Sequence, residues 1–278
     1  MQQCKIDLHT HTIHSDGALS PSELVQKAHD IGLESISITD HDSINGIEEA
    51  LSCSKDLGIE VIPGVEISTD IDNKEMHILG YFFNIYDDEL HKYLQFFRDE
   101  RFHRAKRIVN KLRSFGLNIS IDDVLDRAKN SALGRPHIAS TLVQLGLVGN
   151  YYEAFEKYLR DNGPAYERKI HVSPQSALKL INDAGGLSFV AHPGNVDESI
   201  LMHFIKAGVD GIEVLHPSHN QFQIKFYRGI VNHYCLLECG GSDFHGGIKG
   251  DDNNLGKYCV PTATVDAMKK MLVQNSSN

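Results

Sequence analysis

Short apolar runs that alternate with amphipathic segments are the feature of this chain that most limits its fold. Seven such runs predict strands at residues 5–9, 34–39, 59–67, 76–83, 187–191, 211–215 and 235–239, and the run at 34–39 is rich in β-branched residues. Most of them are separated by stretches with the apolar spacing of a helix, which predicts repeated βα units. Units of this kind build a parallel sheet or a barrel, so the predicted fold class is α/β.

Start and stop signals delimit the helices between these strands. Ser20, Pro21 and Glu23 predict a capping box with proline at the first helical position, and Gly32 suits the helix end. Further helices are predicted at residues 44–57, 174–185, 197–207, 220–232 and 265–273.

The alternation stops between residues 87 and 166, where the sequence is almost entirely helical. A long amphipathic segment at 88–115 has acidic residues at its start and basic residues near its end, as the helix dipole favours. Shorter helices are predicted at 121–129, 136–145 and 152–159. We therefore predict a barrel in two parts, with a helical insertion as the substrate-binding cap; the three domain segments are residues 1–99, 100–165 and 166–278.

Composition narrows the class of protein. The net charge of −10 argues against sequence-independent binding to long duplex nucleic acid, which relies on a basic surface. The sequence has no apolar run of membrane-spanning length, and its start lacks the pattern of a signal peptide. Five cysteines without a Cys-x-x-Cys pair favour reduced thiols over a disulfide framework. These features predict a cytoplasmic protein without a membrane partner; protein partners are not indicated.

Metal-capable side chains recur where the predicted strands end. In a parallel barrel the carboxyl ends of the strands share one face, so residues far apart in sequence converge there. Nine candidates follow or flank the predicted strands in this way, namely His9, His11, Asp16, His41, Glu66, His77, His192, Asp243 and His245. Glu213 lies on a strand as well, and Asp40 and Asp42 are expected to orient ligand imidazoles.

Imidazole and carboxylate groups are ligands for zinc, manganese and iron. A single histidine is more often an ordinary residue than a ligand, but the joint placement of nine candidates favours a metal centre. Nine ligands suffice for two or three ions. With three divalent ions the site would carry a net charge of about +3, which attracts phosphate. Six other histidines lie in predicted helices or loops and are expected to be ordinary: His29, His91, His103, His171, His203 and His233.

Seven motifs in the right order resemble the PHP (polymerase and histidinol phosphatase) family: DLHTHTIHSDG, ITDHDS, PGVEIS, HILGY, AHPG, GIEV and GSDFHG. The motif GRPHIA at 134–139 is similar to the branch of nucleoside 3′,5′-bisphosphate phosphatases and 5′→3′ exoribonucleases of small RNAs. The resemblance implies a distorted seven-stranded, TIM-like (β/α) barrel with three metal ions, manganese favoured over iron or zinc. It covers most of the chain outside the interior of the insertion.

The resemblance also implies a division of the ligands among three ions. His9 and His11 would share the first ion with Glu66 and Asp243. The second ion would be held by Glu66, His77 and His192, and the third by Asp16, His41 and His245. The stretch HTHTIHSDG would thus serve two different ions.

Substrate contacts are expected from the same comparison. Arg135 and His137 of GRPHIA resemble phosphate contacts and are the candidate catalytic residues, and His216 and His219 are further candidates for the substrate pocket. A planar guanidinium suits phosphate oxygens, and the less favoured alternative is that Arg135 is a solvated loop residue. Basic residues between 98 and 113 form either a solvated helix face or a guide for an oligonucleotide.

The sequence therefore predicts a metal-dependent phosphoesterase. The expected substrates are nucleoside 3′,5′-bisphosphates, such as 3′-phosphoadenosine 5′-phosphate, and short 5′-phosphorylated oligonucleotides. Two alternatives remain open, a histidinol phosphate phosphatase and a non-catalytic module that binds metal or nucleotide. The GRPHIA insertion argues against the first, and the full ligand set argues against the second.

Overall fold

A computed structural model describes residues 5–71, 74–128, 133–168, 170 and 172–275. The described residues form two compact units, one running up to His91 and resuming at residue 172, the other covering Lys92–Ile170. We call the first the barrel unit and the second the helical unit. The domain limits predicted from the sequence remain a proposal.

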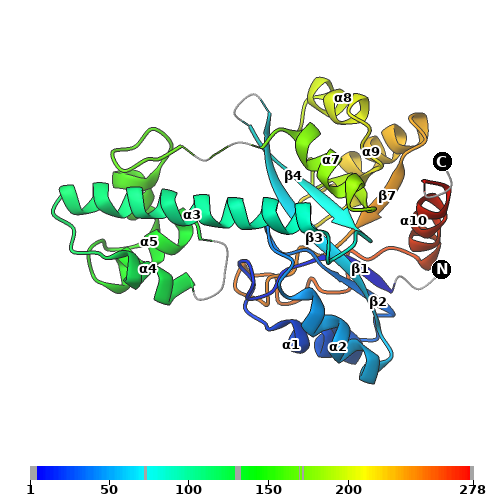
Figure 1. Cartoon of the computed structure of the whole chain (residues 1–278), viewed down its shortest axis with the longest axis horizontal. Helices are drawn as coiled ribbons and strands as arrows, with labels where there is room; N and C mark the ends of the chain where they lie inside the picture. The colour runs from blue at the N-terminus through cyan, green and yellow to red at the C-terminus, as the bar shows by residue number, and fades with distance from the viewer. Residues whose placement is uncertain (1–4, 72–73, 129–132, 169, 171, 276–278) are drawn as a thin grey trace. The chain divides into compact units, whose positions relative to one another are not determined.

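Seven strands form one sheet in the barrel unit, and their spatial order follows the chain. The strands are β1 (Ile6–Thr10), β2 (Ser35–Ile38), β3 (Glu60–Ile71), β4 (Lys74–Tyr81), β5 (Leu187–Val190), β6 (Gly211–Leu215) and β7 (Leu237–Gly240). The two ends of the sheet approach each other, because the N–H of His11 donates to the carbonyl of Phe244 at 2.9 Å. The result is the nearly closed, seven-stranded α/β barrel that the sequence predicted (Figure 1).

The expectation of a wholly parallel barrel is wrong at β4. This strand pairs antiparallel with both β3 and β5, whereas the other neighbouring strands pair parallel. Only residues 72 and 73 separate β3 from β4, and a parallel crossover needs a dozen residues or more. The reversal places the first half of β4 beside the last half of β3, with His77 opposite Ser68.

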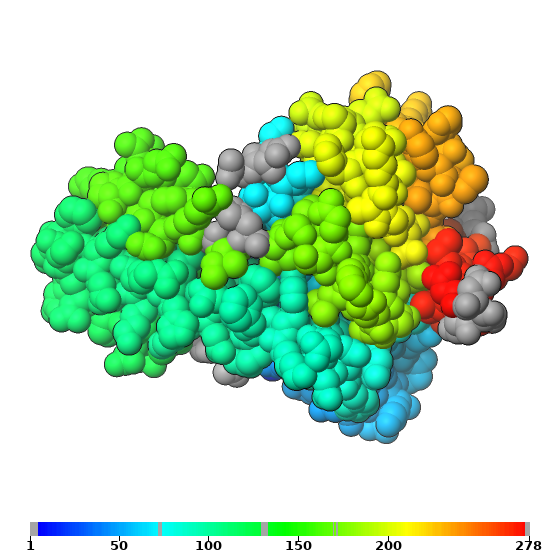
Figure 2. Space-filling model, turned by 45° about the horizontal axis from the view of Figure 1, so that its top comes forward, coloured from blue at the N-terminus to red at the C-terminus, as the bar shows by residue number. Residues whose placement is uncertain are grey.

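Helices cover the outside of the sheet in the barrel unit. They are α1 (Pro21–Asp30), α2 (Ile47–Leu57), α7 (Pro174–Asp183), α8 (Glu198–Lys206), α9 (Gln221–His233) and α10 (Thr262–Asn275). The predicted capping box at Ser20 and Glu23 is present at the start of α1. Helices α1 and α2 pack side by side in Figure 1, and the yellow-green, yellow and orange surfaces of α7, α8 and α9 adjoin one another in Figure 2.

Apolar side chains fill the interior of the barrel beneath the strand ends. Leu8, Leu79, Tyr81 and Phe189 are fully buried there. The hydroxyl of Tyr81 donates to the carbonyl of Leu8 at 2.8 Å, which satisfies the one polar atom of this ring inside the core. This packing fixes the strands whose ends carry the polar residues described below.

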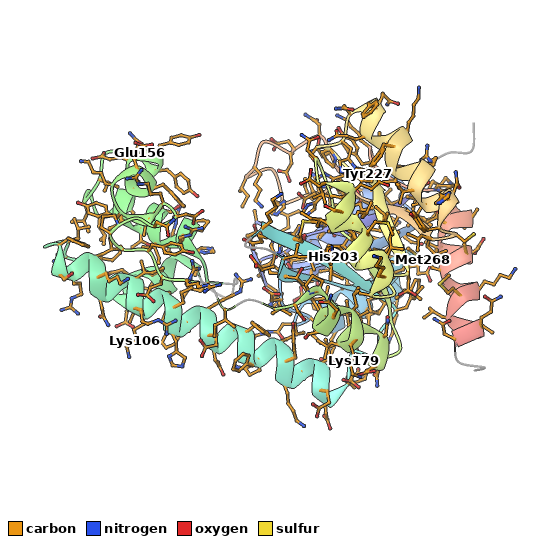
Figure 3. All side chains as sticks on the ribbon, turned by 90° about the horizontal axis from the view of Figure 1, so that it is seen from above. Lys106, Glu156, Lys179, His203, Tyr227 and Met268 are labelled. Carbon is orange, nitrogen blue, oxygen red and sulfur yellow. The ribbon has the colours of Figure 1, made fainter. Side chains whose placement is uncertain are left out.

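The helical unit contains most of α3 (Asp88–Ser114) and the shorter segments after it. These are α4 (Ile121–Ala128), α5 (Arg135–Gln144), α6 (Tyr151–Ala154) and a π-helical turn, η1 (Phe155–Leu159). The last predicted helix is therefore divided in two. Ile108 and Leu112 of α3 pack with Val124, Ile138 and Leu142, so the unit has its own apolar core. Lys106 points away from that core in Figure 3.

The cysteines depart in one respect from the expectation of reduced thiols. Cys53, Cys235 and Cys239 are free, but Cys259 is disulfide-bonded. Spacing along the sequence did not reveal this bond, since pairing depends on which residues the fold brings together. Among the described residues, none of the helices combines the length and the apolar character that a membrane crossing requires.

Candidate metal centre

Histidine and carboxylate side chains gather at one end of the barrel. His9 and His11 come from the end of β1, Asp16 from the loop after it, and His41 from the residues after β2. A β-bridge joins His41 to Glu66 on β3. The antiparallel course of β4 explains why His77, the fourth of the eight residues of its strand, reaches the same place as residues that follow the ends of parallel strands.

The second half of the chain supplies the remaining members. His192 follows β5, His216 follows β6, and Asp243 and His245 follow β7. His192 and Asp243 have positive φ angles of 22° and 49°. Such backbone conformations are costly for residues with side chains and concentrate at functional sites.

The carboxylate of Glu66 lies at the centre of the cluster. Its Oε1 is 2.7 Å from Nδ1 of His77 and 2.8 Å from Nε2 of His192. Its Oε2 is 3.1 Å from Nδ1 of His41, 3.3 Å from Nε2 of His9 and 3.4 Å from Nε2 of His11. The side chain is only 1% exposed, so one buried carboxylate faces five imidazole rings.

Charge within the cluster changes the acidity of its members. Burial alone would raise the pKa of Glu66, but the surrounding imidazoles hold this pKa well below its usual range. Burial lowers the pKa of His41 to about 3. Burial also acts to lower the pKa of His77. The carboxylates of Glu66 and Glu75 outweigh this effect and raise the pKa to about 9. The cluster therefore contains both neutral and protonated imidazoles near neutral pH.

Four overlapping groups of these side chains present atoms close enough to share a metal ion. Within each group the potential ligand atoms lie within 4.8 Å of one another. The groups are His11, Asp16, His41 and His245; His9, His216 and Asp243; His9, Glu66 and His192; and His41, Glu66 and His77.

The structure thus brings together all nine candidates that the sequence singled out. Asp16 lies with His41 and His245, apart from His9, and His11 joins this group as a fourth member. His216, expected in the substrate pocket, has its Nε2 3.4 Å from Oδ2 of Asp243. Its position makes it a potential ligand as well.

Several donor atoms have the environment that a cation would require. Oδ1 of Asp16, Nδ1 of His41 and Nε2 of His216 are buried and make no hydrogen bond within the described part of the chain. The Nε2 atoms of His9 and His11 face each other at 3.1 Å. Buried polar atoms are normally satisfied, so this convergence of lone pairs fits a site for divalent cations.

Glu213 is a functional residue that the sequence candidates did not include. Its Oε1 accepts a hydrogen bond from Nδ1 of His9 at 2.9 Å, and its Oε2 accepts the backbone N–H of His192 at 2.7 Å. This bonding turns Nε2 of His9 toward the cluster and fixes the tautomer. The only sequence signal was a glutamate on an otherwise apolar strand.

Asp40 has a different role from the expected one. It accepts hydrogen bonds from the N–H and hydroxyl of Thr12 and from the hydroxyl of Ser15. Ser15 Oγ lies 3.3 Å from Nδ1 of His11. Asp40 therefore holds the loop after β1 and acts on His11 only through Ser15. Asp42 accepts the backbone N–H of Ser68 at 2.9 Å.

His219 is held by the backbone on both sides. Its Nδ1 donates to the carbonyl of Val214 at 3.0 Å, and its Nε2 accepts the N–H of Gly194 at 3.1 Å. The hydroxyl of Tyr227, which Figure 3 labels, donates to the carbonyl of Gly194 at 2.7 Å. These bonds tie the loop that carries His192 to α9, so His219 has a structural role.

Arg135 and His137 belong to the helical unit. Nη1 of Arg135 donates to the carbonyl of Leu159 at 2.9 Å and to Asp161 at 2.6 Å. Its guanidinium carbon lies 5.6 Å from the centre of the Tyr166 ring. Nδ1 of His137 accepts the backbone N–H of Gly134 at 3.2 Å, at the start of α5. Arg135 is therefore positioned by neighbours of its own unit rather than left as a solvated loop residue.

Some of the basic residues of α3 form contacts within the helical unit. Nε of Arg104 donates to the carbonyl of Glu167, and Arg107 and Lys111 form ion pairs with its carboxylate at 3.2 and 2.7 Å. These contacts join α3 to the chain segment after η1. They favour a structural explanation for this part of the basic face over a guide for an oligonucleotide.

Comparison with known proteins relates the whole chain to one group. The PHP domain family matches residues 7–109. A 5′-3′ exoribonuclease of Haemophilus influenzae is 36% identical, over 87% of this chain and 90% of that protein. A 3′,5′-nucleoside bisphosphate phosphatase of Chromobacterium violaceum is 32% identical, over 92% and 94% respectively.

A solved structure has the same architecture. The crystal structure of a Bifidobacterium adolescentis protein, described as a metal-dependent phosphoesterase, superposes with a TM-score of 0.84. The two sequences are 31% identical, and the match covers 95% of each chain.

Proposed function

This chain belongs to the PHP domain family of metal-dependent phosphoesterases, and we propose that it removes the 3′-phosphate from nucleoside 3′,5′-bisphosphates. We further propose that it degrades short 5′-phosphorylated oligonucleotides in the 5′→3′ direction. The observation that carries the proposal is the buried carboxylate of Glu66 among five imidazoles, at the end of the barrel where potential ligand groups overlap.

The proposed ligands follow the division that the family resemblance implies, and the contacts around Glu66 support it. Glu66 would be shared between ions, with His77 and His192 on Oε1 and with His9 and His11 on Oε2. Asp243, whose Oδ1 lies 3.0 Å from Nε2 of His11, would complete the first position, and Asp16, His41 and His245 would form the third. Three manganese ions are the favoured occupants, with iron or zinc as alternatives.

Divalent ions held here would lower the pKa of bound water and offset negative charge on phosphoryl oxygens. The chain's own contribution is to position these groups. Glu213 fixes the ring of His9, and Asp40 fixes the loop that carries Ser15 beside His11. Because these supports are buried, the ligand atoms are held in place before substrate binds.

The class of substrate is proposed from the named relatives and from Arg135. A nucleoside bisphosphate and the end of a 5′-phosphorylated oligonucleotide share a nucleotide with a 5′-phosphate, which one binding site could recognise. We propose that Arg135 contacts this phosphate and that His137, at the start of α5, lies beside it. The bonds of Arg135 to Leu159 and Asp161 both use Nη1, so they orient the guanidinium from one end.

Phosphate release from purified, manganese-loaded protein tests the proposal. The substrates to compare are 3′-phosphoadenosine 5′-phosphate, adenosine 5′-monophosphate, histidinol phosphate and a short RNA with or without a 5′-phosphate. We expect adenosine 5′-monophosphate as the product of the first substrate, and cleavage of the RNA only when its 5′-phosphate is present. Preferential hydrolysis of histidinol phosphate would instead support the alternative phosphatase.

A pair of variants on β3 separates catalysis from folding. Glu66→Gln removes the shared carboxylate and should reduce phosphate release by about 10³-fold or more, as loss of a metal site would. Glu60→Gln changes an exposed residue of the same strand whose ion pair with Lys269 contributes little to stability. It should remain as active as the original protein. If the fully metal-loaded original protein hydrolyses none of these substrates, that result would favour a non-catalytic module.

We also keep the predicted cytoplasmic location as part of the proposal. Nucleotides and small RNA fragments are generated in that compartment, which suits the proposed substrates. Fractionation of cells that express a tagged protein would test it.

A further inference from the structure

The ammonium of Lys249 lies among the residues that we propose as ligands of one metal ion. Its Nζ donates to Oδ2 of Asp16 at 2.7 Å and to Nε2 of His245 at 2.6 Å. Asp16 and His245 form one potential ligand group together with His11 and His41. Lys249 therefore contacts two of the four side chains of this group.

His245 has one lone pair to offer to a cation. Its Nδ1 donates to the backbone carbonyl of Asp243 at 2.7 Å, which leaves Nε2 as the acceptor. A lone pair that accepts a hydrogen bond from Lys249 cannot bind a metal ion at the same time. The ring therefore has either the ammonium or a divalent ion as its partner.

Lys249 also balances the charge of this group. Asp16 is its one carboxylate, and the three histidines are neutral when they act as ligands. The single positive charge of the ammonium therefore balances the single negative charge of Asp16. A divalent ion in the same position would more than balance it. Asp16 pairs with histidines and also with Lys249, whereas the ion pairs described for Glu66 and Asp243 are with histidines.

The two partners differ in how firmly they are held. The side chain of His245 is 1% exposed, whereas that of Lys249 is 49% exposed. A half-exposed ammonium is already partly hydrated, so it can move fully into water once its hydrogen bonds to Asp16 and His245 break. The imidazole stays in place while the lysine can leave.

We propose that the position formed by Asp16, His41 and His245 is occupied in turn by the ammonium of Lys249 and by a divalent ion. This inference rests on the proposed metal centre and makes this position its exchangeable site. The lysine keeps the group assembled when metal is scarce, and an ion that enters must displace it. Ions that bind around Glu66 displace no such partner from Asp16 and His245.

Calorimetric titration of chelator-treated protein with manganese tests the competition. Lys249→Gln removes the ammonium, and Lys257→Gln removes an exposed lysine charge eight residues further along the chain. We expect Lys249→Gln to bind its most weakly held ion about tenfold more tightly or better, because no charge-assisted hydrogen bond has to be broken first. The tighter ions should be unaffected, and Lys257→Gln should titrate like the original protein.

Chemical reactivity of the original protein gives a second, independent readout. An amine-acylating reagent should modify Lys249 slowly in the metal-free protein and faster once manganese saturates the site, as followed by mass spectrometry of the peptides. This measurement decides the question even if Lys249→Gln does not fold.

An unchanged affinity for the weakest ion in Lys249→Gln, or a reactivity of Lys249 that manganese does not alter, would overturn the inference. A stronger effect in Lys257→Gln than in Lys249→Gln would overturn it too, since the cause would then be long-range charge. If none of the proteins binds any ion, the proposed metal centre itself has failed, and the two failures are thereby distinguished.

Discussion

At the scale of single residues, Glu66 shows how burial and charge compete. An isolated carboxylate in the interior would take up a proton, but the imidazoles around Glu66 keep its pKa well below the usual range. The same residue can therefore accept N–H groups in the metal-free protein and coordinate cations when they are present. The next two predictions concern Glu213, which positions a neighbouring imidazole, and His77, which contacts Glu66 directly.

Glu213→Gln should weaken the metal centre without unfolding the barrel. The amide retains the size of the side chain, but its NH₂ group only donates, so glutamine can accept from either His9 or the N–H of His192 and not from both. Loss of such a supporting partner typically costs about 10- to 100-fold in metal affinity or activity. Metal titration and phosphate release measure the effect.

Glu238→Gln is the matched control for this substitution. Glu238 lies on the adjacent strand β7 and pairs with Arg228 at the surface. Equal losses in Glu213→Gln and Glu238→Gln would show that His9 does not depend on its buried partner.

Binding of metal should expel a proton from His77. The carboxylates of Glu66 and Glu75 overcome the opposing effect of burial and raise the pKa of this imidazole to about 9, so it is protonated at neutral pH. A ligand imidazole must be neutral, hence metal affinity should rise with pH until about pH 9. Calorimetry in two buffers with different ionisation enthalpies should count about one more proton released by the original protein than by His77→Gln.

His203→Gln, a change at an exposed position of helix α8, serves as the control for proton release (Figure 3 labels His203). It should release as many protons as the original protein. The same number of protons from His77→Gln would refute the role given to this ring.

The sequence predicted the cluster at this scale because each member follows or flanks a strand. It did not separate Glu213 from any other glutamate on a buried strand, since what matters is the contact with His9, made across more than 200 residues. His219 comes after a predicted strand, as the ligand candidates do, yet both of its ring nitrogens bind backbone groups. Residue type and strand position thus indicate a site, while roles within it depend on hydrogen bonds that only the fold defines.

At the scale of elements, the direction of β4 is the main departure from the predicted barrel. The predicted strands at 59–67 and 76–83 left eight residues between them, already too few for a parallel crossover. The spacing could therefore have predicted the hairpin. Strand and helix positions were otherwise recognisable because apolar spacing and capping residues act locally, as at Ser20 and Glu23.

The contact between the two ends of the sheet depends on a glycine. A Cβ atom at Gly241 would lie 2.3 Å from the backbone nitrogen of His9. Gly241→Ala must displace the end of β1 and should destabilise the protein by about 1–3 kcal/mol, the usual cost of overpacking. It should also weaken metal binding, because His9 moves with the strand. Urea unfolding of the metal-free protein measures the first effect and metal titration the second.

Gly229→Ala in α9 is the contrasting substitution. A Cβ atom at this exposed helical position meets nothing within 4 Å, so alanine should stabilise the protein by about 0.5–1 kcal/mol. If Gly241→Ala were as stable as Gly229→Ala, the close approach of the strand ends would be wrong.

At the scale of the whole molecule, the barrel unit explains how a protein with a net charge of −10 could act on phosphorylated substrates. Negative charge is spread over the chain, while imidazoles and proposed metal ions concentrate positive charge at one end of the barrel. The family match to residues 7–109 covers six of the nine candidate ligands, since His192, Asp243 and His245 come later. Both segments of the barrel unit must therefore fold together for the site to exist.

Removal and return of metal tests the central claim most directly. Protein stripped with a chelator should contain no bound ions by elemental analysis and should lose phosphate release from 3′-phosphoadenosine 5′-phosphate to about 1% or less, since no other group here supplies the chemistry of a divalent ion. Manganese should restore both the metal content and the activity. Undiminished phosphate release from the stripped protein would contradict the account.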